Sequence, residues 1–394
     1  MVRFTPATKN QLYNAIRQMS ASTGIHNEHG HINDWDVSHV TDMSWMFHRM
    51  HEFNQPLDRW NVSNVTNMLG MFAYCNEFSQ PLNSWNVSNV TNMSNMFYEC
   101  YYFNKPLNSW NVSNVTDMSR MFRACYAFKQ PLNSWNVSNV TDMENMFYNC
   151  YAFNQPLHNW NVSNVTNMSY MFQYCRAFNQ PLNSWNVSNV TNMHGMFQYC
   201  RAFNQPLNSW NNVSNVTDMS WMFDECSAFN QPLNSWDVSN VTNMVGMFHD
   251  CRAFNQPLNS WNVSNVTDMS IMFRGCNAFH QVLPWKLHVH VDTMSMFRGS
   301  HGSLLERRSP GTIRRRNGEL AHSIIKRSNH PNMMRFDDDH LSPIEADAPN
   351  YIERLMANVR KKSPELLMGK TTRRKRSRSR SQSESRKQPR RKVK

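Results

Sequence analysis

The stretch that decides the fold is one unit of a tandem repeat: Trp160-Asn-Val-Ser-Asn-Val-Thr-Asn-Met-Ser-Tyr-Met-Phe-Gln-Tyr-Cys-Arg-Ala-Phe-Asn-Gln-Pro-Leu-Asn-Ser184. The unit recurs at 25-residue intervals seven times, and then at intervals of 26, 25 and 24 residues. A fixed period of this length indicates a repeat architecture, in which each unit buries its apolar edge against its neighbours. We therefore expect an elongated solenoid of about eleven repeats over residues 35–297. Its units are marked by Trp35, Trp60, Trp85, Trp110, Trp135, Trp160, Trp185, Trp210, Trp236, Trp261 and Trp285.

The apolar residues inside the unit change their spacing midway. Those of the first half recur as on one face of a short helix: Met168, Met171, Phe172, Cys175 and Phe178. Pro181 stops any helix, and Leu182, Trp185 and Val187 then follow the L-x-x-L-x-L spacing of a leucine-rich-repeat strand. Each unit is thus expected to hold one short parallel strand, a turn, and a short helix or 3₁₀ segment.

Stacked repeats place equivalent residues in columns. The two Met columns are expected in the core beside Phe, since Met fills irregular gaps well. The Asn and Ser columns are expected to form side-chain ladders or to bond turn backbone, with a ligand-binding polar stripe as the alternative.

Nine cysteines occur once per repeat at one position, without any Cys-x-x-Cys pair. A single parallel column does not supply the converging ligands of a zinc site, and parallel Cβ vectors disfavour bridging between neighbours. We expect a buried column of reduced thiols, with bridged pairs or a metal as the alternatives, and no cofactor.

The ends of the array differ from its middle. Residues 1–34 are expected to form an N-terminal cap, with a helix between Pro6 and Met19 that buries Leu12, Ala15 and Ile16 against the open edge of the first repeat. Residues 280–297 lose the regular phrases, which fits a degenerate C-terminal cap.

The phrase Phe-Asn-Gln-Pro-Leu-Asn-Ser-Trp-Asn-Val-Ser-Asn-Val-Thr-Asn-Met-x-x-Met-Phe resembles the DUF285 repeat, also called the BspA-like or bacterial surface protein 26-residue repeat. The lead-in from Phe4 to Ser38 is similar as well, so the resemblance covers about residues 4–297. It implies a leucine-rich-repeat-like fold and a role in protein–protein interaction or adhesion, without catalytic residues.

Some positions vary between the repeats. They lie one and two residues after the first Met and in the pair just before the Cys, and many are expected to be exposed. Tyr, Trp and Arg are enriched at interface hot spots, so these residues are candidate partner contacts, with drift at unconstrained surface sites as the alternative. The candidates are Trp45, Tyr74, Tyr98, Arg120, Tyr148, Tyr170, Tyr199 and Trp221.

Residues 298–394 form a basic tail. They carry 26 Lys/Arg and 10 Asp/Glu, a net charge of +16, whereas residues 1–297 carry 14 and 18, a net of −4. Their composition favours disorder, with a short helix expected within residues 348–368. Two basic clusters flank an Arg-Ser segment and resemble a bipartite nuclear localisation signal, so we expect nuclear targeting or nucleic-acid contact, with a solubilising tail as the alternative. The residues concerned are Arg373, Arg374, Lys375, Arg376, Arg378, Arg380, Arg390, Arg391 and Lys392.

The sequence contains neither a stretch of ~20 apolar residues that could span a membrane nor the apolar core of a signal peptide. We therefore expect an intracellular location, with the nucleus as a candidate compartment. The sequence also lacks nucleophile, phosphate-loop and paired-carboxylate signatures, so an enzyme is not expected. The first hypothesis is a non-enzymatic interaction scaffold with an unknown protein partner, and the alternative is a surface-displayed adhesin.

Overall fold

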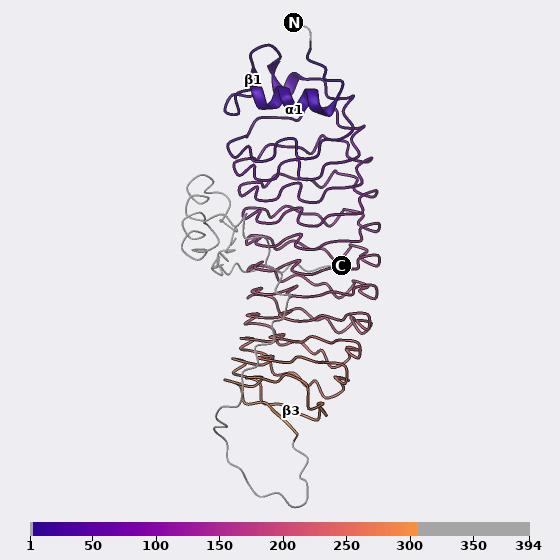
Figure 1. Ribbon diagram of the computed structural model, residues 1–394, viewed down its shortest axis with the longest axis vertical. Helices are drawn as coiled ribbons and strands as arrows, with labels where there is room; N and C mark the ends of the chain where they lie inside the picture. The colour runs from indigo at the N-terminus through magenta and orange to yellow at the C-terminus, as the bar shows by residue number, and fades with distance from the viewer. Residues whose placement is uncertain (1–2, 306–394) are drawn as a thin grey trace, which may run out of the picture. The chain divides into compact units, whose positions relative to one another are not determined.

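The computed structural model describes residues 3–305, which form a stack of coils with one coil per repeat (Figure 1). Successive coils run in the same direction. Parallel bridges join equivalent residues of neighbouring coils, from Asp42–Asn67 at one end to Asp268–Asp292 at the other. The repeat fold that the 25-residue period predicts is therefore confirmed.

The core consists of columns of identical side chains. Met168, Phe172 and Cys175 are completely buried, as are their equivalents in the other regular repeats. Neighbouring rings lie nearly parallel, so that Trp160 and Trp185 have centroids 6.4 Å apart and planes inclined by 2°. The indole Nε1–H of Trp185 donates to the Leu157 carbonyl of the preceding coil at 3.0 Å, which satisfies a polar group that burial would otherwise leave unpaired.

The prediction of a short helix or 3₁₀ segment in each repeat is wrong. Residues 168–178 form successive turns, in which the Met171 N–H donates to the Met168 carbonyl, three residues earlier. Tyr170 and Tyr174 have φ angles of 56° and 62°, and an α-helix excludes such left-handed residues. The core prediction nevertheless holds, because a chain of three-residue turns brings residues i, i+3 and i+7 to one side much as a helix does.

The position of the expected strand is also wrong. Along Leu182–Val187 the backbone closes turns, with the Trp185 N–H donating to the Leu182 carbonyl at 3.0 Å. The parallel bridge of each coil lies instead at the Asn before the first Met, as between Asn167 and Asn192. In residues 3–305 the strands proper are confined to the ends of the stack: β1 (Ile25–His26), β2 (Gly30–His31), β3 (Val282–Leu283) and β4 (Ser303–Leu304).

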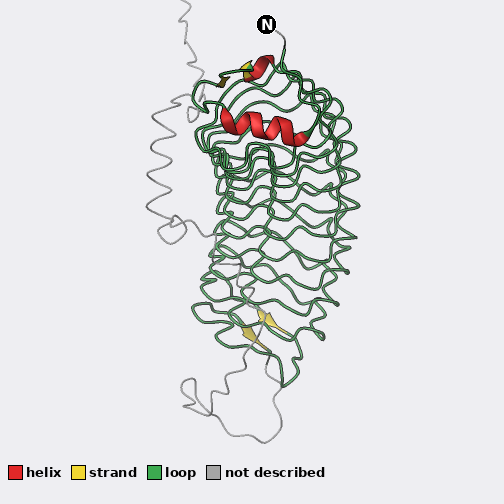
Figure 2. Cartoon of the chain, turned by 45° about the horizontal axis from the view of Figure 1, so that its top comes forward, coloured by secondary structure: helices red, strands yellow, loops and turns green. Residues whose placement is uncertain are grey.

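The helix α1 (Lys9–Gln18) lies across the first coil at the N-terminal end, followed by the antiparallel pair β1–β2 and a 3₁₀ helix, Ile32–Asp34 (Figure 2). The Thr8 hydroxyl accepts the Gln11 N–H and caps its start. Leu12, Ala15 and Ile16 are buried, as the apolar spacing predicts.

At the other end the stack extends beyond the expected boundary at residue 297. The chain pairs β4 with β3 in parallel, with Val282 opposite Ser303. The predicted helix within 348–368 and the two basic clusters lie outside the described residues. Within residues 3–305, helices are too short and too polar to cross a membrane.

Candidate interaction surface

Two positions in every coil have a left-handed backbone whatever residue occupies them. The first column includes Trp45, Asn95 and Arg120, with φ between 57° and 59°. Gly and Asn adopt this conformation readily, but other residues accept a cost of roughly 1–2 kcal/mol. Stability alone favours Gly or Asn at these positions. Large side chains there are therefore candidates for a functional role.

Three aromatic side chains of the first column lie flat over a glycine of the next coil. A Cβ atom on Gly70 would come within 2.2 Å of the Trp45 ring, and Gly195 and Gly246 lie in the same way under Tyr170 and Trp221. The glycines thus make room for the ring of the preceding repeat. These pairs fix the aromatic side chains on the surface before any partner arrives.

Tyrosine and arginine side chains form a continuous network between these columns. Tyr74 packs edge-on against Tyr98 with centroids 4.9 Å apart, and the Arg123 guanidinium lies over both Tyr98 and Tyr148, at 5.4 and 4.4 Å. Ten of the twelve tyrosines of the chain fall between residues 74 and 199. Cation–π contacts of this kind hold long side chains in place.

A second aromatic column was missed by the sequence reasoning. Tyr101, Tyr126 and Tyr151 follow the Cys of three successive repeats and stack with centroids 4.8 and 5.3 Å apart. These rings are buried, so the column supports the surface residues and is not itself exposed to a partner. Arg176 covers the Tyr151 ring at 5.1 Å, and Tyr174 stacks on Tyr199 at 4.4 Å. The sequence does carry a signal for this column, because a Tyr directly follows the second, third and fourth of the nine cysteines.

Beyond the tyrosines the same face becomes more polar. The Asp224 carboxylate is only 3% exposed and accepts hydrogen bonds from Gln198 Nε2 at 2.7 Å and His249 Nδ1 at 2.8 Å. The hydrogen bond to Asp224 raises the pKa of His249, against the effect of burial. The Trp221 ring packs against the His249 edge, with centroids 5.9 Å apart.

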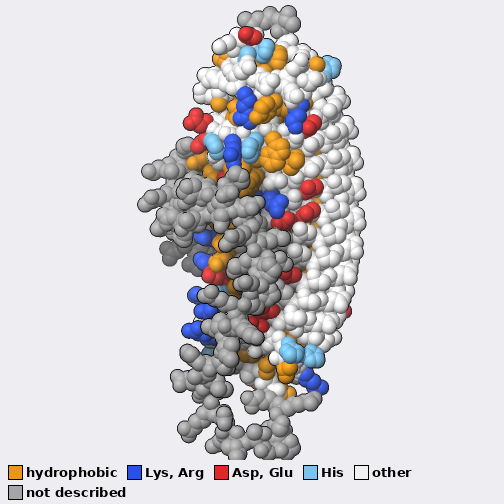
Figure 3. All heavy atoms as spheres, in the orientation of Figure 1, with side chains coloured by type: hydrophobic (Ala, Val, Ile, Leu, Met, Phe, Trp, Pro, Cys, Tyr) orange, Lys and Arg blue, Asp and Glu red, His pale blue; other side chains and the backbone are white. Residues whose placement is uncertain are grey.

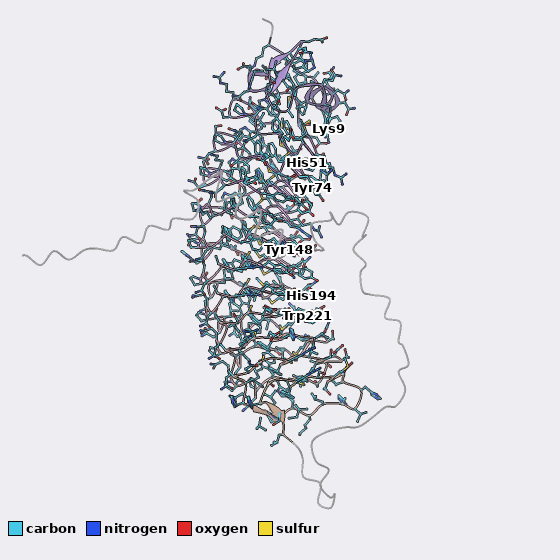
Figure 4. All side chains as sticks on the ribbon, turned by 90° about the vertical axis from the view of Figure 1, so that its left-hand side faces the viewer. Lys9, His51, Tyr74, Tyr148, His194 and Trp221 are labelled. Atoms are coloured by element: carbon cyan, nitrogen blue, oxygen red, sulfur yellow. The ribbon has the colours of Figure 1, made fainter. Side chains whose placement is uncertain are left out.

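We call this surface the variable face, and Figure 3 shows charged, histidine and apolar side chains gathered along it, beside a face of uncharged polar residues. Figure 4 shows Tyr74, Tyr148, His194 and Trp221 following one another along the stack. The variable face comprises Trp45, Arg49, Tyr74, Tyr98, Arg120, Arg123, Tyr148, Tyr170, Tyr174, Arg176, His194, Gln198, Tyr199, Trp221 and His249, and it is supported by the buried residues Tyr101, Tyr126, Tyr151 and Asp224.

All eight predicted contact residues lie on the variable face. Trp45 is 37% exposed, but the other seven are half-buried, because each lies against a side chain or backbone of a neighbouring coil. Burial is the main cause that raises the pKa of Tyr170 and of Tyr199 to about 12. The prediction that many of these residues are exposed therefore holds only in part, and their role as contacts stays a prediction.

The neighbouring face is built from the constant Asn, Ser and Thr residues, and we call it the constant face. Asn64 Nδ2 donates to the Ser38 carbonyl of the preceding coil at 2.9 Å, and Thr66 Oγ1 donates to the Thr41 carbonyl at 3.3 Å. The same bonds recur along the stack, for example from Asn164 to Ser138. Of the two predicted arrangements, bonding to the backbone is the one these columns show, and the bonds hold neighbouring coils together.

The cysteine column is buried, and all nine thiols are free. Each Sγ–H donates to a Phe carbonyl of the preceding coil, as Cys150 does to Phe122 at 3.0 Å. Burial raises the pKa of every one of these thiols, for instance Cys150. Within residues 3–305, His, Cys, Asp and Glu side chains nowhere gather in a group of three that could hold a metal ion.

These features define a tandem-repeat protein whose units differ mainly along one face. The family model described as "Mycoplasma protein of unknown function, DUF285" matches residues 12–134, 116–214 and 211–304. The chain belongs to the DUF285 family.

Other comparisons add little. A chain in the solved structure titled "Crystal structure of TLR13-ssRNA13 complex" is similar over 75% of this chain and 55% of its own length, with 8% identity and a TM-score of 0.25. A TM-score this low supports no inference about fold or function. No curated protein matches the sequence.

Proposed function

We propose that the protein is a non-enzymatic scaffold, a leucine-rich-repeat-like solenoid whose variable face binds a protein partner. The observation that carries the proposal is the Tyr–Arg network, in which Arg123 lies over both Tyr98 and Tyr148. Tyr, Trp and Arg dominate interface hot spots because they supply large contact area together with hydrogen-bonding groups. The contrast between a varied face and a constant one favours recognition by the former.

Preorganisation supports the same conclusion. A side chain that is already immobilised by stacking loses little conformational entropy when a partner binds, and each mobile side chain otherwise costs about 0.5–1.5 kcal/mol. The half-buried rings of Tyr174 and Tyr199 are stacked on each other, with centroids 4.4 Å apart. Paratopes of antibodies use tyrosine for the same reason.

A catalytic role is not proposed. The buried Asp224 is engaged by Gln198 and His249, and the thiols face the core and donate to backbone carbonyls. The hollow of about 480 Å³ at the N-terminal end is lined by Arg3, Phe4, His29, Asp34 and Arg59 among others. There the Arg59 Nη1 is paired with the Asp34 carboxylate at 2.8 Å.

Matched variants of the full chain test the proposal. Tyr98→Ser with Tyr148→Ser removes two rings from the variable face, whereas Thr116→Ala with Thr141→Ala alters two residues of the constant face. The parent chain and the two variants are each immobilised and incubated with an extract of the source cells. We expect at least one protein to be captured by the parent chain and the constant-face variant but not by the variable-face variant.

Equal capture by the two variants, with circular dichroism showing that both remain folded, would contradict the proposal. The alternative of a surface-displayed adhesin has its own test. A tagged full chain that is accessible to antibody on intact cells would favour the adhesin over an intracellular scaffold.

A further inference from the structure

The backbone hydrogen bonds between coils are unequal in direction. One regular column points toward the N-terminal end, as the Thr166 N–H donates to the Thr141 carbonyl of the preceding coil, whereas four columns point the other way. In every coil four peptide groups point the same way, with the carbonyl toward the N-terminal end and the N–H toward the C-terminal end. In the middle of the stack the N–H groups of Met168, Tyr170, Phe172 and Tyr174 all donate to the next coil. Four hydrogen-bonded columns of aligned peptide dipoles therefore run through the array. By the reasoning that applies to a helix, the carbonyl end is negative and the N–H end positive.

The negative end is covered by cations of the cap. Arg17 Nη2, in the last turn of α1, donates to the carbonyl of His48 in the first coil at 2.9 Å. Lys9 Nζ lies 2.9 Å from the Asp42 carboxylate in the same coil. This end of the columns is thus closed by a helix that brings charge of the appropriate sign.

The positive end has no such cover among residues 3–305. The next N–H groups in the four columns belong to Thr293, Ser295, Phe297 and Gly299, and none has a hydrogen-bond partner within that range. Their equivalents one coil earlier all donate, as the Gly275 N–H does to the Arg298 carbonyl at 2.9 Å. We call these four groups the donor edge.

Exposed apolar side chains occur among the last described residues of the stack. Val289, Met294 and Leu305 are 94%, 68% and 61% exposed, and they are among the few large hydrophobic residues exposed in residues 3–305. Lys286 and Arg298 supply positive charge close by in the sequence. The one acid of this last coil, Asp292, is engaged, because its Oδ1 accepts the Met294 N–H at 2.8 Å.

We infer that the donor edge binds the main chain of an acidic polypeptide segment, which adds to the stack as one more layer. A row of N–H donors is satisfied by a row of acceptors, and a polypeptide segment provides one when it takes the backbone conformation of the coils, in which the carbonyls of alternate residues point to one side. The dipole columns and the two cations favour acidic side chains in that segment. This surface is distinct from the variable face and does not depend on its function.

A second copy of the chain does not fit this edge. Two donor edges that meet would place N–H groups against N–H groups. The matching carbonyl edge, formed in the first coil by residues such as Asp42 and His48, lies under α1 in the described structure. The partner must therefore be a segment of a different kind.

Glycine labelling of the full chain gives a direct test. The chain has eleven glycines, so ¹⁵N-glycine labelling yields few amide signals, and Gly299→Asn identifies that of Gly299. The probes are two synthetic twelve-residue peptides of alternating Thr and Glu, or of alternating Thr and Lys. We expect the Thr–Glu peptide to shift the Gly299 signal and slow its hydrogen exchange, while the Gly275 signal stays unchanged.

Two variants place the same new charge at different coils. Met294→Glu puts a carboxylate beside the donor edge, and Val245→Glu puts one at the equivalent position two coils earlier, a column in which Glu144 already occurs. We expect the first to weaken binding of the Thr–Glu peptide about tenfold, and the second to leave it unchanged.

Three results would overturn the inference. One is that neither peptide perturbs Gly299. Another is that the Thr–Lys peptide binds as well as the Thr–Glu peptide. The third is that the Gly299 amide is already protected in the full chain without peptide, which would mean that the chain covers its own donor edge.

Discussion

Replacing Gly70 by Ala tests how the chain positions its surface aromatic side chains. The added Cβ would lie 2.2 Å from two carbons of the Trp45 ring, so the ring must leave its place. The backbone of Gly70 also has φ +57°, where Ala is strained by roughly 1–2 kcal/mol. The substitution thus combines a local backbone cost with the loss of a surface contact.

The magnitude follows from three contributions. The displaced ring of Trp45 loses part of its packing, which at ~25 cal/mol per Å² over some tens of Å² costs about 1–2 kcal/mol. The backbone strain adds roughly 1–2 kcal/mol, and the smaller entropy of the unfolded chain returns about 0.4–1 kcal/mol. We expect Gly70→Ala to lower the free energy of unfolding by about 2 kcal/mol in total.

Urea unfolding of the full chain, followed by circular dichroism, measures this change. Asn95→Ala is the matched control, because Asn95 has the same left-handed backbone, with φ 57°. The equivalent residue of the coil before it is Gly70, whereas the equivalent residue before Gly70 is Trp45. Combining Gly70→Ala with Trp45→Ala isolates the steric part as a coupling energy. The reasoning is refuted if Gly70→Ala costs no more than Asn95→Ala, or if removing Trp45 leaves its cost unchanged.

Four further outcomes are expected. Trp160→Phe leaves the buried Leu132 carbonyl without its 2.9 Å bond from the indole and should cost about 1–3 kcal/mol in urea unfolding, whereas no loss would show that the carbonyl finds another donor. The nine thiols should react with a thiol-specific reagent only at the rate of unfolding, because burial raises the pKa of thiols such as Cys150; fast labelling in native buffer would contradict this. The hydrogen bond to Asp224 raises the pKa of His249 above 6.5. The ion pair therefore stabilises the folded protein fully below pH 6.5, and this stabilisation is lost as pH rises through the folded-state pKa. His249→Asn should thus lower the free energy of unfolding in acid and have less effect in base. Equal effects at both pH values would show that the imidazolium is not what Asp224 stabilises. Deleting residues 370–394 should abolish nuclear accumulation and flatten the salt dependence of nucleic-acid binding, which has a slope near −0.9 per phosphate contact on duplex DNA; unchanged location and binding would remove the tail from the hypothesis.

The sequence predicted what depends on the period, and failed where local backbone choice depends on the neighbouring coil. The burial of Met168, Phe172 and Cys175 follows from their spacing alone, since a helix and a chain of turns both place such residues on one side. The backbone hydrogen bonds of these residues do not follow from the spacing. In this stack alternate N–H groups donate to the next coil, and the sequence of a single repeat does not indicate this pattern.

The left-handed positions illustrate the same limit at the candidate site. Gly70, Asn95 and Trp45 share one backbone conformation, although only Gly and Asn have an intrinsic preference for it. Because the stacking sets this conformation, a propensity argument on Trp45 misses it. The column of Tyr101, Tyr126 and Tyr151 is likewise not predicted by the variation before each Cys, because it lies at the residue after the Cys.

The added residue at Asn211–Asn212 shows what the constant columns permit. The repeat there is one residue longer, yet Trp236 Nε1 still donates to Leu207 at 3.0 Å and Trp236 stacks on Trp210. A coil touches only its two neighbours, so length can be altered by whole units without redesigning the remainder. Each unit adds about 4.8 Å to the length of the stack. Gain or loss of one 25-residue unit would therefore change the distance between the N-terminal cap and the donor edge by about 4.8 Å.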